Sequence, residues 1–170
     1  RNKLGIFEAG ISFPGEMEKL QKIIDPDIGI ITNIGDAHSD NFPDNVVKAE
    51  EKLKLFINSS LIIYCSDHEL IHQSILNNEI LKTKILVDWS CEKEEAKVFI
   101  KKSQLPRGRT GIQMKYNGVI NDFEIPFSDR ASVENAITVA TVCLAMGIPA
   151  SIISCGMTGL VSVAMRMEMK

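Results

Sequence analysis

The sequence predicts an α/β fold, with a mostly parallel sheet flanked by helices and followed by a small antiparallel hairpin region. Short continuous apolar runs alternate with amphipathic stretches in the first half, a pattern typical of parallel strands that are covered on both faces. In the second half, Asn117-Gly118 separates two strand-like runs, which predicts a β-hairpin. The composition, 45% hydrophobic and 24% charged, is that of a globular domain.

The first half reads as strands and helices in alternation. Continuous apolar runs predict strands at residues 4–7, 28–32, 61–64 and 85–87. Apolar residues at helical spacing predict helices over residues 16–24 and 46–57. The inward stripe of the second helix consists of Val46, Ala49, Leu53, Phe56 and Ile57. A third helix is expected after residues 66–69, which have the pattern of a capping box.

The pattern changes near Ser90. Antiparallel strands are expected within residues 96–100 and 111–127, a long helix over 131–146, and a further helix that begins at Pro149. We expect one partial domain over residues 1–164 and the beginning of a linker at residues 165–170, with the chain truncated at both ends.

Charge and cysteine usage exclude several classes of function. The net charge is −3, and the Lys and Arg residues form no basic cluster. The sequence therefore argues against nucleic acid as the main partner. No apolar run approaches the roughly 20 residues of a membrane span, and the first residues do not form a signal peptide. The four cysteines contain no C-x-x-C pair and predict free thiols in a reducing compartment. A cytoplasmic protein without membrane insertion is therefore expected.

Polar residues follow the first two predicted strands, where open α/β sheets carry their chemistry. Glu8 is either a hard oxygen ligand for Mg²⁺ or a solvated carboxylate at a strand end. The loop Thr32–His38 crowds small and polar residues, including Asn33, after a buried strand. His38 is a candidate metal ligand or proton carrier, although a loop histidine is more often simply solvated.

Lys52 lies beside the apolar stripe of the second helix. Desolvation there favours a neutral amine, which can react with carbon dioxide and form a metal-binding carbamate. The alternative is an ordinary lysine whose ammonium reaches solvent past its buried stem. Lys48 and Lys54 are expected to point further outward.

A competing motif is the H-E-x-x-H run formed by His68, Glu69 and His72. On a helix, both histidines could bind zinc, with Glu69 as the general base of a metallopeptidase. The alternative is three surface residues on the first turns of a helix, with Glu69 in a capping role. The sequence contains no G-x-x-x-x-G-K-[ST] loop for phosphate binding.

Several segments together resemble the Mur ligase family. Residues 8–17 (EAGISFPGEM) look like the family pattern E-x-G-x-x-x-x-G-E-[IM], and residues 32–38 (TNIGDAH) look like T-N-I-x-x-A-H. Fourteen residues after His38, Lys52 aligns with the carbamylated lysine of a run like A-K-x-E-[IL]-F. Lys54 departs from the Glu of that run.

The second half carries two further similarities. Residues 132–136 (SVENA) resemble the N-x-x-N-A pattern, in which Asn135 matches and Ser132 replaces the first Asn. Residues 163–168 (VAMRME) resemble the family's hinge segment, with Arg166 at the position of an Arg that contacts ATP phosphates. The tail and residues 51–56 are also similar to versions that are fused to alanine racemase, so a fused racemase domain is a candidate partner.

The resemblance implies an ATP-dependent amide ligase of peptidoglycan precursor synthesis that works through an acyl phosphate. The nearest branch adds D-alanyl-D-alanine to UDP-N-acetylmuramoyl (UDP-MurNAc) tripeptide, with ATP and Mg²⁺ as cofactors. In it, Glu8, His38 and carbamylated Lys52 bind metal, and the last two are also catalytic. Asn33, Asn135 and Arg166 contact the nucleotide.

The same resemblance implies that the phosphate loop precedes Arg1 and that a C-terminal domain follows Lys170. The isolated chain is therefore expected to be inactive. Two alternatives share this fold: a related ligase with another amine substrate, and a non-catalytic module.

Overall fold

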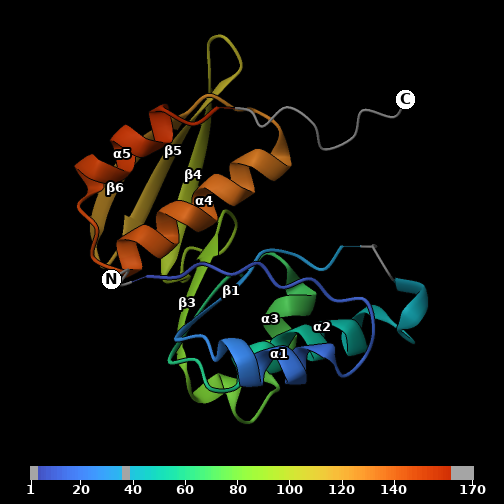
Figure 1. Ribbon diagram of the computed structural model, residues 1–170. Helices are drawn as coiled ribbons and strands as arrows, with labels where there is room; N and C mark the ends of the chain where they lie inside the picture. Colours follow the sequence, from blue (N-terminus) through green and yellow to red (C-terminus); the bar gives the residue numbers. More distant parts are fainter. Residues whose placement is uncertain (1–3, 36–38, 162–170) are drawn as a thin grey trace. The chain divides into compact units, whose positions relative to one another are not determined.

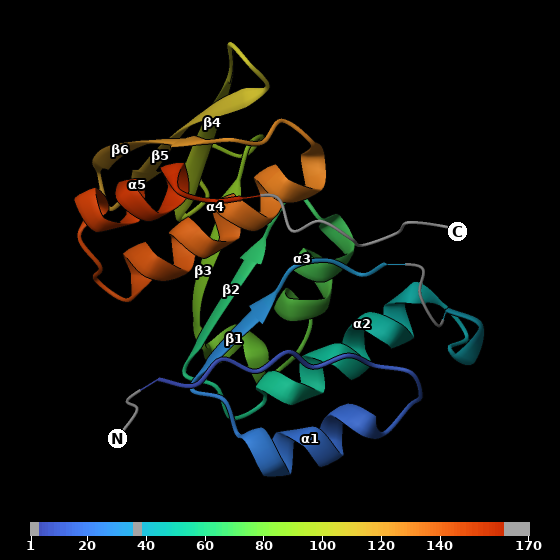
Figure 2. The same ribbon diagram turned by 45° about the horizontal axis from the view of Figure 1, so that its top comes forward.

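The computed structural model describes residues 4–35 and 39–161, and the chain divides into two compact units at the boundary between Asp88 and Trp89. Six strands form a mixed sheet in sequence order, β1 to β6, with helices beside it (Figures 1 and 2). The predicted α/β class, with a parallel part and an antiparallel hairpin part, is confirmed.

In its described residues, the first unit contains three α-helices and a parallel strand pair. In chain order its elements are α1 (Glu16–Ile24), β1 (Ile28–Ile31), α2 (Asn45–Leu53), β2 (Leu61–Cys65), α3 (Glu69–Leu76) and the start of β3 (Ile85–Ser90). Strands β1 and β2 pair in parallel, from Ile28 opposite Leu61 to Ile31 opposite Tyr64. Helix α2 contacts both α1 and α3, and α3 contacts β2. The carboxyl ends of the strands therefore lead into the loops beside these helices.

The core of this unit depends on a close approach between β1 and the 3-10 turn η2 (Lys54–Phe56). The ring of Phe56 lies directly over Gly29, where an added Cβ would come within 2.5 Å of the ring. Only glycine allows this contact without movement of the ring. Met17, Leu53 and Ile62 are buried in the same cluster.

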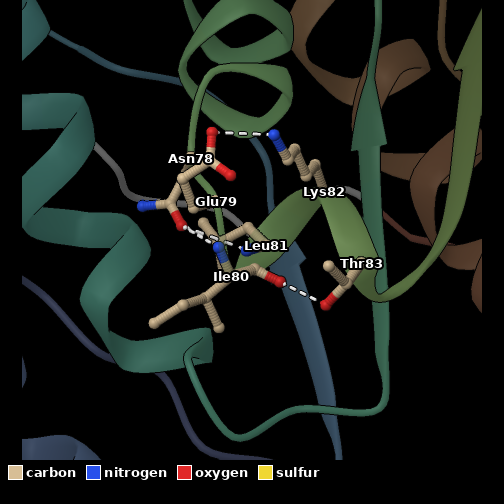
Figure 3. Close-up of polar contacts among 6 residues, drawn as sticks. All are labelled: Asn78, Glu79, Ile80, Leu81, Lys82 and Thr83. Atoms are coloured by element: carbon tan, nitrogen blue, oxygen red, sulfur yellow. Dashed lines mark hydrogen bonds and ion pairs between the residues drawn. The ribbon is translucent and has the colours of Figure 1, made fainter.

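The connection from α3 to β3 is fixed by local polar contacts (Figure 3). The side-chain oxygen of Asn78 accepts hydrogen bonds from the backbone N–H groups of Ile80 and Leu81, both at 3.0 Å. Thr83 donates its hydroxyl to the Ile80 carbonyl at 2.7 Å. These bonds close the turn η3 (Leu81–Thr83) and set the start of the third strand.

The second unit contains the end of β3, which pairs in parallel with β4, followed by antiparallel strands and, in its described residues, two α-helices. Its elements are β4 (Val98–Leu105), β5 (Arg109–Tyr116), β6 (Val119–Ile125), α4 (Arg130–Ala145) and α5 (Ala150–Thr158). Asn117 and Gly118 both have positive φ, 50° and 79°, as the predicted two-residue hairpin requires. Helices α4 and α5 contact each other as well as β5 and β6 respectively.

Two local predictions were wrong. Residues 4–7 form no strand, and Ile6 is 87% exposed; β1 is the first strand in the order, and residues 4–7 do not pair with its outer edge. The expected cap position was also wrong. The N-cap of α3 is His68, which makes no side-chain cap hydrogen bond, and the Ser66 hydroxyl donates to Asp88. None of the helices in the described ranges combines the length and apolar character needed to cross a membrane.

Candidate functional site

A cleft of about 330 Å³ lies in the first unit beside the carboxyl end of β1. Two loops and one face of α2 form its walls. The lining residues are Gly10, Ile11, Ser12, Asn33, Gly35, Lys48 and Lys52. A smaller cavity of about 90 Å³ shares Asn33 and Lys52 with it. The structure therefore brings together two of the residues that the sequence singled out.

Lys52 extends from α2 toward the loop after β1. Its Nζ donates to the backbone carbonyl of Asn33 at 3.3 Å. Burial, and secondarily the positive charge of Lys48, lower the pKa of Lys52. Both effects disfavour the ammonium, because a charged group loses hydration on burial and is repelled by a like charge. The amine is thus more readily neutral than an ordinary lysine, as carbamate formation requires.

Lys48 was expected to point outward, and this prediction was wrong. Its side chain is only 1% exposed, and its Nζ donates to the Gly35 carbonyl at 2.5 Å. Val46, which was placed on the inward stripe, is 48% exposed. The helix is therefore rotated relative to the expected stripe, which brings Lys48 to the cleft. The spacing of four residues between Lys48 and Lys52 was the available signal, because such residues share a helix face.

Glu51 links α2 to the loop that forms the opposite wall. It is 4% exposed and accepts hydrogen bonds from the Gly15 backbone N–H and from Lys54 Nζ, both at 2.7 Å. The departure of Lys54 from the Mur pattern thus has a structural role, since its ammonium pairs with a buried carboxylate. This pairing raises the pKa of Lys54.

The loop itself is held by two further side chains. Glu16 accepts hydrogen bonds from the backbone N–H groups of Ser12 and Phe13, at 2.7 and 2.9 Å. Asn41 donates its amide to the Ser12 carbonyl at 2.9 Å. The wall made by residues 10–12 is therefore positioned by contacts from both α1 and the segment before α2. Glu16 is the second Glu of the motif over residues 8–17, but the sequence alone indicated no positioning role for it or for Asn41.

The other described residues that the sequence singled out are not among those that line the cleft. Glu8 is exposed in an irregular segment, while its neighbours Ala9 and Gly10 line the smaller cavity and the cleft respectively. Asn135 is exposed on α4, in the second unit. His38 and Arg166 lie outside the described residues.

A divalent cation needs oxygen or nitrogen ligands, and the described residues offer few of them. Within residues 4–35 and 39–161, no three His, Cys, Asp or Glu side chains are grouped to hold a metal. The cleft instead presents the Lys52 amine. A carbamate at that position would supply carboxylate-like oxygens, the ligands that Mg²⁺ prefers. Among the described residues, a fit to the cation thus depends on that carbamate, because the two charged side chains that line the cleft are both lysines.

The H-E-x-x-H residues do not form the arrangement of a zinc peptidase in the described part of the chain. His68 precedes α3 rather than lying on it. The Nδ1 atom of His72 is 3.1 Å from the Tyr64 hydroxyl, and the two rings stack with centroids 5.8 Å apart. Burial and the Asp88 carboxylate raise the pKa of Tyr64. His72 is thus engaged in a packed contact with a buried strand residue.

Several known proteins are similar to this chain in sequence or in fold. A UDP-N-acetylmuramoyl-tripeptide–D-alanyl-D-alanine ligase of Bacillus subtilis is 25% identical over 98% of this chain and 35% of its own length. A MurF crystal structure from Acinetobacter baumannii has a TM-score of 0.76 and 21% identity, over 91% of this chain and 34% of that one. A Thermotoga maritima MurF ligase structure in complex with ADP has a TM-score of 0.72 and 18% identity, over 89% and 34%.

This chain therefore spans about a third of the length of these relatives. The description Mur ligase middle domain matches residues 1–143, which include the cleft, both of its lysines and Asn135. With most of its residues matched in this way, the chain belongs to the Mur ligase middle domain family.

Proposed function

We propose that this chain is the nucleotide-handling part of an ATP-dependent ligase that adds D-alanyl-D-alanine to UDP-MurNAc-tripeptide. The observation that carries the proposal is the cleft in which the half-buried Lys52 amine meets the loop after β1, in a chain of this family. The printed name of the Bacillus subtilis relative supports the substrates, and the ADP in the Thermotoga maritima structure supports the nucleotide.

The reaction class is amide formation through an acyl phosphate. The tripeptide carboxylate takes the γ-phosphoryl group of ATP, and the amine of D-alanyl-D-alanine then displaces phosphate. Positioning and charge neutralisation dominate the catalysis of such phosphoryl transfers. Mg²⁺, when bound, neutralises charge on the phosphoryl oxygens.

In this proposal, Glu8, His38 and carbamylated Lys52 hold Mg²⁺. The carbamate forms when the neutral Lys52 nitrogen bonds to the carbon of CO₂ and releases a proton. Asn33, at the cleft, contacts the nucleotide. Asn135 contacts the adenine, and Arg166 contacts the phosphates.

The remaining parts of the activity belong to a longer protein. The relatives are about three times as long as the matched region. We place the middle domain at residues 1–164 and the beginning of a linker at 165–170, and expect no ligase activity from the chain alone. The four cysteines are free thiols, which supports a reducing, cytoplasmic location.

The test is phosphate release from ATP by the complete protein that carries this chain. Release should require both UDP-MurNAc-tripeptide and D-alanyl-D-alanine. Lys52→Ala should lower it by about a hundredfold or more, as loss of a group that stabilises transition-state charge does. Lys22→Ala, at an exposed ion pair on α1, is the matched control. Release that ignores the dipeptide would point to another amine, and no release from a folded protein would refute the ligase proposal.

A further inference from the structure

Two lysines one helical turn apart enter the same cleft. Lys48 donates to the Gly35 carbonyl and Lys52 to the Asn33 carbonyl, so the two side chains contact alternate residues of one loop. Lys48 is almost fully buried, whereas Lys52 is partly exposed. Both line the cleft of about 330 Å³. Their ammonium groups thus belong to one site.

The two ammonium groups repel each other while both are cationic, and the charge of Lys48 acts on Lys52. Like charges four residues apart on a helix repel each other, and the repulsion is stronger where water is partly excluded. A negatively charged group on Lys52 would convert the repulsive pair into an attractive one.

We propose that Lys48 is a positioning residue that stabilises a carbamate on Lys52 by charge complementarity. This inference rests on the carbamate in the proposed function. The Lys52 nitrogen forms a bond to the carbon of CO₂, one C=O π pair moves to oxygen, and one proton leaves the nitrogen for solvent. Lys48 is not consumed, and its ammonium supplies a positive charge in the same cleft as the anion that results.

Lys54, another lysine close to Lys52 in the sequence, does not serve this role. Lys54 is two residues away but pairs with Glu51, whose other oxygen holds Gly15. Lys48, in contrast, is anchored at the loop that Lys52 also contacts. A carbamate has two oxygens, so a contact with Lys48 leaves the second oxygen available for a metal.

The experiment is ¹³C NMR of the complete protein in Mg²⁺-free buffer with limiting ¹³C-labelled bicarbonate at fixed pH. Lys52→Ala assigns the carbamate signal by its loss. Lys48→Met should lower carbamate occupancy by about tenfold, the effect of removing one hydrogen bond to a charged group. Lys22→Met removes an equal charge from an exposed ion pair on α1 and should leave the occupancy unchanged.

A second measurement uses the unmodified protein, so it does not depend on the folding of a variant. The ¹⁵N signal of the Lys48 ammonium should shift as CO₂ is added, in step with the carbamate signal. A carbamate whose occupancy is the same in a folded Lys48→Met variant, or an unshifted Lys48 signal, would overturn this inference and leave the ligase proposal intact. Absence of any carbamate on the unmodified protein would overturn it together with the proposed Lys52 chemistry, while the phosphate-release assay would still decide the ligase activity.

Discussion

The contact between Glu51 and Gly15 predicts a measurable loss of stability in the Glu51→Ala variant. Glu51 is buried on α2, and its two oxygens accept from the Gly15 N–H and from Lys54, both at 2.7 Å. Gly15 has a left-handed φ of 85° at the beginning of α1. The contact therefore fixes the point at which the wall of the cleft turns into the first helix.

The magnitude follows from the two contacts separately. A hydrogen bond to a charged group contributes about 1.5–3 kcal/mol, and removal of the carboxylate leaves the Gly15 N–H without this acceptor. The ion pair adds less, about 0–1 kcal/mol, because the Lys54 side chain is 46% exposed. We therefore expect Glu51→Ala to lower the free energy of unfolding by about 2–3 kcal/mol.

Urea unfolding followed by circular dichroism, with hydrogen exchange of the Gly15 amide, checks this expectation. Glu51→Gln retains an oxygen acceptor for Gly15 and should cost about 1 kcal/mol. Lys54→Met removes only the ion pair and should cost less than about 1 kcal/mol. Equal losses in Glu51→Ala and Lys54→Met, or an unchanged exchange rate at Gly15, would refute the reasoning.

Two further predictions concern β1 and the Lys52 amine. Gly29→Ala should destabilise the protein by about 1–3 kcal/mol through overpacking, since the added Cβ would come within 2.5 Å of the Phe56 ring. Gly10→Ala is the control, because a Cβ at Gly10 would meet no atom within 4 Å. Equal urea midpoints for the two variants would contradict this prediction. In CO₂-free buffer, stability should rise with pH toward the ordinary lysine pKa near 10.4, because the lowered pKa of Lys52 lets the folded state lose its proton first while the unfolded state keeps it. Urea titrations across that pH range should show that the free energy of unfolding depends less steeply on pH in Lys52→Met. The same pH dependence in the variant would argue against a lowered pKa of Lys52.

Much of the fold could be predicted because its signals are local. The helix over residues 16–24 has the predicted bounds, and Asn117-Gly118 forms the expected turn. The errors came from long-range contacts. Ser66 looks like a cap in its local pattern, but its hydroxyl meets Asp88, 22 residues away. An apolar run such as residues 4–7 predicts burial, although a strand also needs a paired neighbour.

The site was only partly predictable for a related reason. Lys52 lies beside an apolar stripe, and that position indicated its burial and its unusual amine. The burial of Lys48 depends on which side of the helix faces the loop after β1, and Val46 misled the assignment because it is apolar but half-exposed. Glu51 gave no signal at all, since its main partner, Gly15, is 36 residues away in sequence.

The different sides of helix α2 make different contacts, with the core, the cleft and the loop around Gly15. Asp44 caps the helix through the Val47 N–H at 2.8 Å, and Leu53 enters the core. Lys48 and Lys52 face the cleft, while Glu51 holds the opposite wall. One rigid helix thus sets both the cationic side of the cleft and the distance to its wall. A shift of α2 that moved the lysines would also break the Glu51 contact, so the stability measured at Glu51 and the carbamate occupancy measured at Lys52 should change together when the helix is displaced.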